Sequence, residues 1–168
     1  MASGSSRTAV HGNVTPMYNF VLILHSWIRW IALVAGMGAT IAAFNARAQK
    51  AALGRADRWG VALMAALDLQ MLLGLLLYLV LSPTMQEILQ NFSAAMQDRA
   101  ARFWAVEHLS TMLVAVMLVH VGRVLARRAA TPQAKRTRLL LCFGVATLAM
   151  IAATPWPGLS NGRPLFRF

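Results

Sequence analysis

The 168 residues carry a formal net charge of +11, yet only 12% of them are charged, 58% are hydrophobic and the mean hydropathy is +0.57. A soluble domain of this length needs more charge to cover its surface. The apolar residues fall into four blocks, each near the ~20 residues that cross a bilayer as a helix. The composition therefore predicts a single all-α membrane domain. It disfavours nucleic-acid binding, because the basic residues gather in loops beside apolar blocks.

The N-terminus and the cysteine content limit the processing and the chemistry of the chain. Residues 1–16 are polar and lack the basic-then-apolar order of a cleaved secretory signal, so we expect an outer tail followed by an uncleaved first helix. The one cysteine, Cys142, lies in the last apolar block. An intrachain disulfide, a c-type haem attachment motif and cysteine zinc sites are therefore excluded.

The apolar blocks predict an up-and-down bundle of four transmembrane helices within residues 17–154. In the first, Ala35, Ala39 and Ala43 form a small-residue stripe that lets another helix approach closely. Ser82-Pro83 ends the second helix, because proline cannot continue its hydrogen bonds. The fourth stops at Pro155-Trp156, and residues 155–168 form an outer C-terminal tail. The helices are expected over residues 17–44, 59–81, 102–125 and 137–154.

The stretch between the second and third helices has a different character. Residues 84–87 resemble a capping box, and apolar residues follow at helical spacing, opposite a polar face. The stretch is too short and polar to span, so it predicts a short helix lying in the membrane interface. An ordinary amphipathic connector remains the alternative.

The distribution of Lys and Arg predicts the orientation of the bundle. The loops after the first and third helices carry about twice as many as the opposite side, which has Arg7, Arg99, Arg102, Arg163 and Arg167. Basic loops stay in the cytoplasm. We therefore expect a bacterial inner-membrane protein with both termini in the periplasm.

Two histidines lie at matching depth in helices that run in the same direction. His25 lies about eight residues below the start of the first helix, and His108 about six below the start of the third, so they differ by about 3 Å in depth. The first and third helices of such a bundle are diagonal, and their inward side chains meet across the core. This arrangement suits two ligands of one b-type haem. Hydrogen-bonding histidines, another metal and a proton path are the alternatives.

Other polar residues have predicted roles around this pair. Arg99 and Arg102 lie above His108, where they are candidates to pair with haem propionates. Arg29 and Asp68 both lie near mid-membrane, which predicts a buried ion pair. Glu107 is either solvated or the acceptor of a proton from a quinol. The remaining intramembrane histidine, His120, has no histidine at its level and is expected to be an interface residue.

Three short stretches resemble small bacterial four-helix membrane proteins grouped with b-type cytochromes: residues 25–30 (HSWIRW), 107–112 (EHLSTM) and 155–157 (PWP). The resemblance implies a haem-bearing, quinol-linked membrane protein with His25 and His108 at the matching positions. Members with two haems need four histidine ligands. This chain has three in its helices, and its fourth, His11, lies in the tail, so the resemblance extends to one haem only.

Two functions follow as hypotheses. The first is a small b-type cytochrome that holds one haem b between His25 and His108. It would relay electrons with a quinol or a periplasmic carrier, as a subunit beside other membrane proteins. The alternative is a cofactor-free accessory subunit of a larger respiratory or photosynthetic membrane complex, with residues 154–168 docking onto a partner. Whether the protein has a catalytic activity of its own is left open by the sequence.

Overall fold

A computed structural model describes residues 6–47 and 49–167, and side chains from residue 16 onward. The described chain consists of helices and their connections and contains no strand, which confirms the all-α prediction. Residues 1–5 of the expected polar tail lie outside the described part. Residues 6–16 of that tail belong to the first helix.

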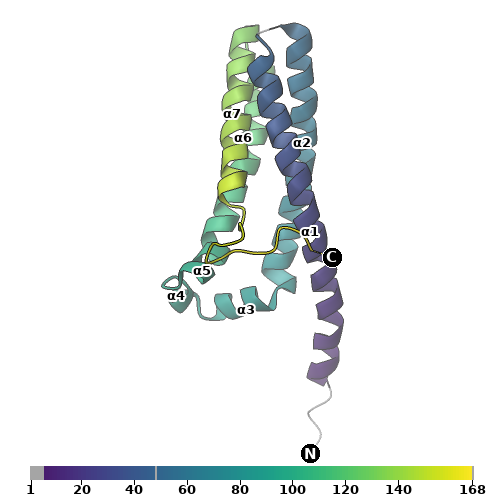
Figure 1. Ribbon diagram of the computed structural model, residues 1–168, viewed down its shortest axis with the longest axis vertical. Coiled ribbons are helices and arrows are strands. Elements are labelled where there is room, and N and C mark those ends of the chain that lie inside the picture. Colours follow the sequence, from purple (N-terminus) through teal and green to yellow (C-terminus); the bar gives the residue numbers. More distant parts are fainter. Residues whose placement is uncertain (1–5, 48, 168) are drawn as a thin grey trace, which may run out of the picture.

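Four long helices lie side by side (Figure 1). They are α1 (Ser6–Asn45), α2 (Lys50–Leu76), α6 (His108–Arg127) and α7 (Pro132–Ala152). A π-helical segment, η1 (Leu77–Leu81), continues α2 up to the Ser82-Pro83 stop predicted from the sequence. Helix α1 packs on α2 and α7, and α6 packs on the same two helices. Helices α1 and α6 are therefore diagonal to each other.

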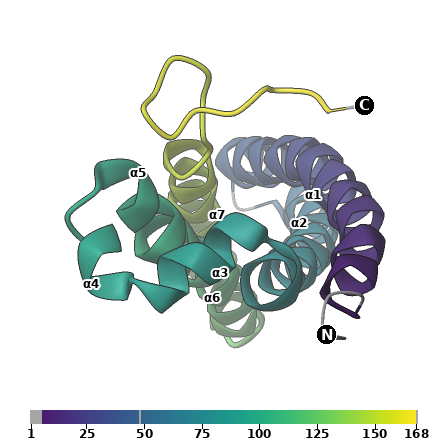
Figure 2. The same ribbon diagram turned by 90° about the horizontal axis from the view of Figure 1, so that it is seen from below.

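Short elements close the end of the molecule opposite the α1–α2 and α6–α7 loops (Figures 1 and 2). They are α3 (Pro83–Gln90), α4 (Phe92–Ala95), α5 (Arg99–Arg102) and the π-helical η2 (Phe103–Glu107), which leads directly into α6. The cap of α3 is Ser82, whose Oγ accepts a hydrogen bond from the Met85 amide. The predicted capping box at residues 84–87 is wrong, because Pro83 is already the first residue of the helix.

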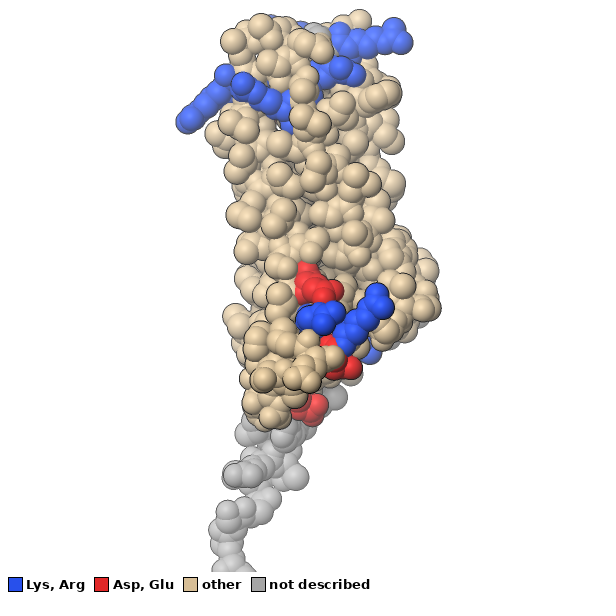
Figure 3. Space-filling view, turned by 90° about the vertical axis from the view of Figure 1, so that its left-hand side faces the viewer, with Lys and Arg blue, Asp and Glu red and all other residues tan. Residues whose placement is uncertain are grey.

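Three helical stretches are long and apolar enough to cross a membrane: Pro16–Asn45, Lys50–Leu81 and Arg99–Arg127. They indicate a membrane protein. Helix α7 is not among these stretches, because its first turns carry Lys135, Arg136 and Arg138. Its apolar part from residue 139 to 152 is only about 21 Å long, against ~30 Å of hydrocarbon. In Figure 3, Lys and Arg gather at the loop end, above a broad uncharged band.

Small residues allow the helices to pack closely. Ala35, Ala39 and Ala43 are almost completely buried, as the stripe predicted. Gly60 of α2 lies directly against the ring of Phe143 in α7. Without a hydrophobic effect between helices in lipid, such close contact is a main source of packing energy.

The basic residues at the start of α7 bind the ends of the neighbouring helices. Arg136 donates to the Phe44 carbonyl near the end of α1 at 2.8 Å, and Arg138 donates to the Leu125 carbonyl of α6 at 2.6 Å. Lys135 forms an ion pair with Asp57 of α2 at 2.6 Å. Helix-end carbonyls lack intrahelical partners, so these contacts satisfy them and join all four helices at this end.

The contact between Gly60 and Phe143 gives a test of the packing. We expect Gly60→Ala to lower the thermal unfolding midpoint in detergent by several degrees, because the added methyl group collides with the ring at a cost of about 1–3 kcal/mol. Gly54→Ala is the matched control on the same helix, since nothing lies within 4 Å of its added Cβ. That change should leave the midpoint unchanged or raise it, because alanine favours helix. Equal midpoints for the two variants would contradict the packing.

Candidate functional site: a histidine-lined cavity

A cavity of about 330 Å³ lies between α1, α2 and α6, at the level where α7 ends. Helix α7 stops at Ala152, whereas α1 and the α5–η2–α6 helix continue past that level (Figure 1). The volume of the cavity is at the lower end of the range of ligand pockets. Side chains from the long helices, the short elements and the C-terminal segment line it, including His25, Arg29, Gln70, Tyr78, Trp104, His108, Met112, Arg163 and Arg167.

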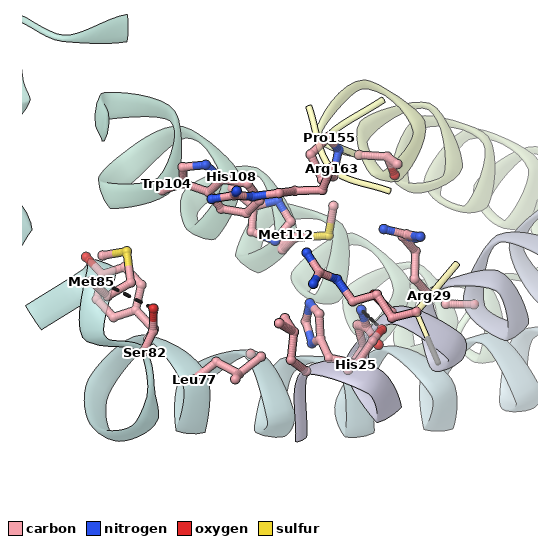
Figure 4. A pocket seen from close by; sticks show the side chains of 18 of the residues that line it. His25, Arg29, Leu77, Ser82, Met85, Trp104, His108, Met112, Pro155 and Arg163 are labelled. Carbon is pink, nitrogen blue, oxygen red and sulfur yellow. Dashed lines mark hydrogen bonds between the residues drawn. The ribbon is translucent and has the colours of Figure 1, made fainter. Parts of the chain in front are cut away.

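The two histidines predicted as a pair both line this cavity, on opposite sides of it (Figure 4). Their ring centroids are 6.5 Å apart, and the ring planes are inclined at 64°. His108 Nδ1 lies 2.9 Å from the carbonyl oxygen of Ala153, just beyond the end of α7. As a donor to that oxygen, Nδ1 carries the proton, and Nε2 keeps its lone pair free.

The imidazole of His25, unlike that of His108, makes no hydrogen bond through its Nδ1 to a described residue. That nitrogen is buried, while the carbonyl oxygen of His25 accepts a bond from Gln70 at 3.0 Å. Gly74 of α2 leaves room for the imidazole, because a Cβ there would lie 3.2 Å from His25 Cε1. Buried polar atoms are rarely left unpaired in proteins. The unpaired nitrogen is therefore an observation that a ligand would explain.

The two π-helical segments bring α2 and α6 together beside His108. Tyr78 in η1 donates its hydroxyl to the carbonyl of Ala105 in η2 at 2.7 Å. Single π-helical turns within α-helices are frequent at functional sites, where they re-aim side chains. Here η2 ends at the residue before His108 and places Trp104 against its imidazole, with ring centroids 5.6 Å apart. Sequence patterns do not reveal such a turn.

Residues 155–167, which we call the C-terminal strap, run back across the bundle to α1. The Leu165 carbonyl accepts hydrogen bonds from Arg29 at 2.7 Å and from Trp30 at 3.2 Å. Phe166 stacks on Trp30 with ring centroids 5.5 Å apart. Arg163 lies over the ring of Trp104 on the other side of the cavity, at 5.3 Å. The strap thus docks on its own chain and covers the cavity.

The arginines around the cavity are not those predicted from the sequence. Arg29, Arg163 and Arg167 line it, whereas Arg99 and Arg102 do not. Arg102 instead pairs with Glu107, Nε to Oε1 at 2.9 Å, and donates to the Met96 carbonyl. The prediction considered only the helix that carries His108, and the strap supplies arginines from a distant part of the sequence. Glu107 is about half exposed and lies outside the cavity lining.

The predicted Arg29–Asp68 ion pair is wrong. Arg29 binds the strap, and Asp68 Oδ1 lies 2.8 Å from His120 Nε2 of α6. Asp68 follows the cavity-lining Leu67, so its side chain points about 100° away around the helix. Similar depth in the membrane was not enough to bring the two charges together, because they lie on different faces. His120 links α6 to α2 through this contact.

No protein-family model matches the chain, and comparisons with curated proteins and with solved structures also give no match. The resemblance to small b-type cytochromes therefore stays a prediction.

The Asp68–His120 contact predicts energetic coupling that the Arg29–Asp68 pairing does not. In a double-mutant cycle, Asp68→Ala and His120→Ala should couple by at least about 0.5 kcal/mol, because the residues are in contact. Arg29→Ala and Asp68→Ala should be additive, since they share no partner. The free energy of unfolding can be followed by titration with sodium dodecyl sulfate in mixed micelles. Coupling of Asp68 to Arg29 instead of His120 would contradict the observed contacts.

Proposed function

We propose that this protein is a small b-type cytochrome, with one haem b ligated by His25 and His108 in the cavity. The single observation that carries the proposal is the 6.5 Å separation of the two imidazole centroids across that cavity. An imidazole nitrogen ligates a first-row metal at about 2 Å, and the ring centre lies roughly 1 Å behind it. Two ligands on opposite sides of one metal therefore place their centroids about 6 Å apart.

The state of each histidine supports the same proposal. A ligating histidine almost always donates its other ring N–H to a carbonyl or carboxylate, and Ala153 supplies that acceptor for His108. His25 has a buried nitrogen without a partner among the described residues. Within the same part of the chain, no group of three or more His, Cys, Asp or Glu could hold a bare ion. Two histidines suffice when the metal arrives with its own equatorial ligands, as in haem.

A bound haem would supply one-electron redox chemistry. The residues of this chain would orient and shield it. The Ala153 carbonyl fixes the tautomer of His108, and Trp104 and Met112 line the cavity wall beside it. With one haem, the protein cannot conduct electrons across the whole bilayer by itself. The proposal is a relay to a quinol or a periplasmic carrier, within a larger membrane complex.

The same proposal places the protein in the bacterial inner membrane with four crossings. Helix α7 is short, but Arg136 and Arg138 can extend toward the cytoplasmic surface along their apolar stems. Trp156 follows the other end of α7 and suits the outer interface. The basic loops then face the cytoplasm, and both termini face the periplasm. Helix α3 would lie in the outer interface.

The crossing of α7 can be tested with alkaline phosphatase, which folds to its active form only in the periplasm. A fusion after Phe168 should be active in a Gram-negative host, and a fusion after Arg128 should be inactive. An inactive C-terminal fusion on a stably expressed protein would show that α7 does not cross.

The haem proposal predicts a sharp b-type α-band in the dithionite-reduced minus oxidised spectrum of the purified protein. His25→Ala and His108→Ala should each abolish that low-spin band, because each removes a histidine that would hold the haem. His120→Ala is the matched control, since it removes an intramembrane histidine outside the cavity and should leave the band unchanged. A flat spectrum from folded wild-type protein, produced with haem available, would refute the cytochrome.

The second candidate is a cofactor-free accessory subunit, and one observation favours an attached partner in either case. The side chains of Asp68 and His120 are 48% and 46% exposed on the outer surface of α2 and α6. Polar groups facing lipid at mid-membrane are costly and normally face protein or water. A neighbouring membrane subunit over this pair would remove that cost. A flat spectrum in the experiment above would leave this candidate standing.

A further inference from the structure

The cavity collects positive charge without an acidic counterpart. Arg29, Arg163 and Arg167 contribute guanidinium groups, and none of the described residues that line the cavity is an aspartate or a glutamate. Arg29 and Arg167 are half-buried, whereas Arg163 is exposed. Half-buried charges require compensation, because desolvation is expensive. The cavity is therefore built for a ligand that carries negative charge.

The positions of these arginines fix the direction in which that negative charge must point. Figure 4 shows Arg29 near His25 and Arg163 near His108. Each histidine of the pair therefore has a positively charged side chain beside it. Arg163 and Arg167 belong to the strap and line the cavity. In the proposed orientation, the strap lies on the outer side. An anionic group bound here faces the strap and the outer surface, while the apolar body of the ligand lies deeper, toward Leu67 and Met150.

The side chains have donors to offer. The Nε of Arg29 is buried and has no partner among the described residues, although its Nη2 binds Leu165. Arg163 lies over the ring of Trp104, and no hydrogen bond of its guanidinium group to another described residue is present. Planar guanidinium groups bind carboxylates through two parallel hydrogen bonds, so paired carboxylates suit this group of arginines.

We propose that the C-terminal strap is part of the ligand site: Arg163 and Arg167, with Arg29, bind the two carboxylates of an amphiphilic dicarboxylate ligand. This inference rests on the proposed function, in which the carboxylates are the propionates of haem. It assigns to the strap the role that the sequence suggested for Arg99 and Arg102. The strap is then a binding element rather than a surface for docking onto another protein.

The test compares two double variants of the full-length protein with the same change in net charge. Wild type, Arg163→Gln/Arg167→Gln and Arg99→Gln/Arg102→Gln are produced in haem-deficient cells and purified in detergent. Each is titrated with ferric haem and, separately, with its dimethyl ester, in which both carboxylates are blocked. The shift of the Soret band reports binding, and thermal unfolding of the unloaded proteins shows that both variants are folded.

We expect the strap variant to bind haem at least about tenfold more weakly than wild type, because charge-assisted hydrogen bonds are lost. Its affinity for the dimethyl ester should equal that of wild type. The Arg99/Arg102 variant should bind both ligands as wild type does.

Three results would overturn the inference while leaving the cytochrome intact: equal haem affinity in all three proteins, equal weakening in both variants, or equal weakening for haem and ester. The second would show a general charge effect, and the third a loss of shape. Folded wild-type protein that takes up neither ligand would overturn the cytochrome and, with it, this assignment. The two failures are therefore distinguishable.

Discussion

The site depends on the early end of α7. Because the helix stops at Ala152, its last carbonyls lack the amide donors of a further turn, and the Ala153 carbonyl is available to His108. The same end leaves the space that becomes the cavity and releases the chain as a strap. One helix terminus thus orients an imidazole, opens a pocket and supplies the segment that covers it. The Pro155-Trp156-Pro157 sequence ensures that the helix cannot continue.

The two ends of the bundle have different physical characters. At the loop end, arginines and a lysine from α7 join helix ends and an acidic residue, and alanines and glycines bring the helices into direct contact. At the other end, the helices separate around the cavity and are joined through η1, η2 and the strap. Rigid packing at one end and a lined opening at the other suit a protein that holds a ligand near one surface. Tyr78, which lines the cavity, links η1 to η2 at this end through its hydrogen bond to the Ala105 carbonyl.

The polar residues within the helices fall into two separate groups. His25, Arg29 and His108 turn inward to the cavity, whereas Asp68 and His120 form their own pair on the outer surface of α2 and α6. The first group is the basis of the proposed cofactor site, and the second of the proposed contact with another subunit. Asp68 does not line the cavity that holds His25, Arg29 and His108. The two groups therefore do not form one continuous polar path among the described residues.

The sequence by itself determined the helices and the histidine pair. Apolar block length and proline positions located four helices, and the depths of His25 and His108 placed them at one level, because helical rise is constant. Only the tertiary structure decided which charges meet. The rotation of each helix about its axis places Asp68 beside His120. The path of residues 155–167 places Arg163 and Arg167 at the cavity, where the sequence predicted Arg99 and Arg102. Side-chain direction and strap placement depend on packing between distant segments, which residue spacing along one helix does not encode.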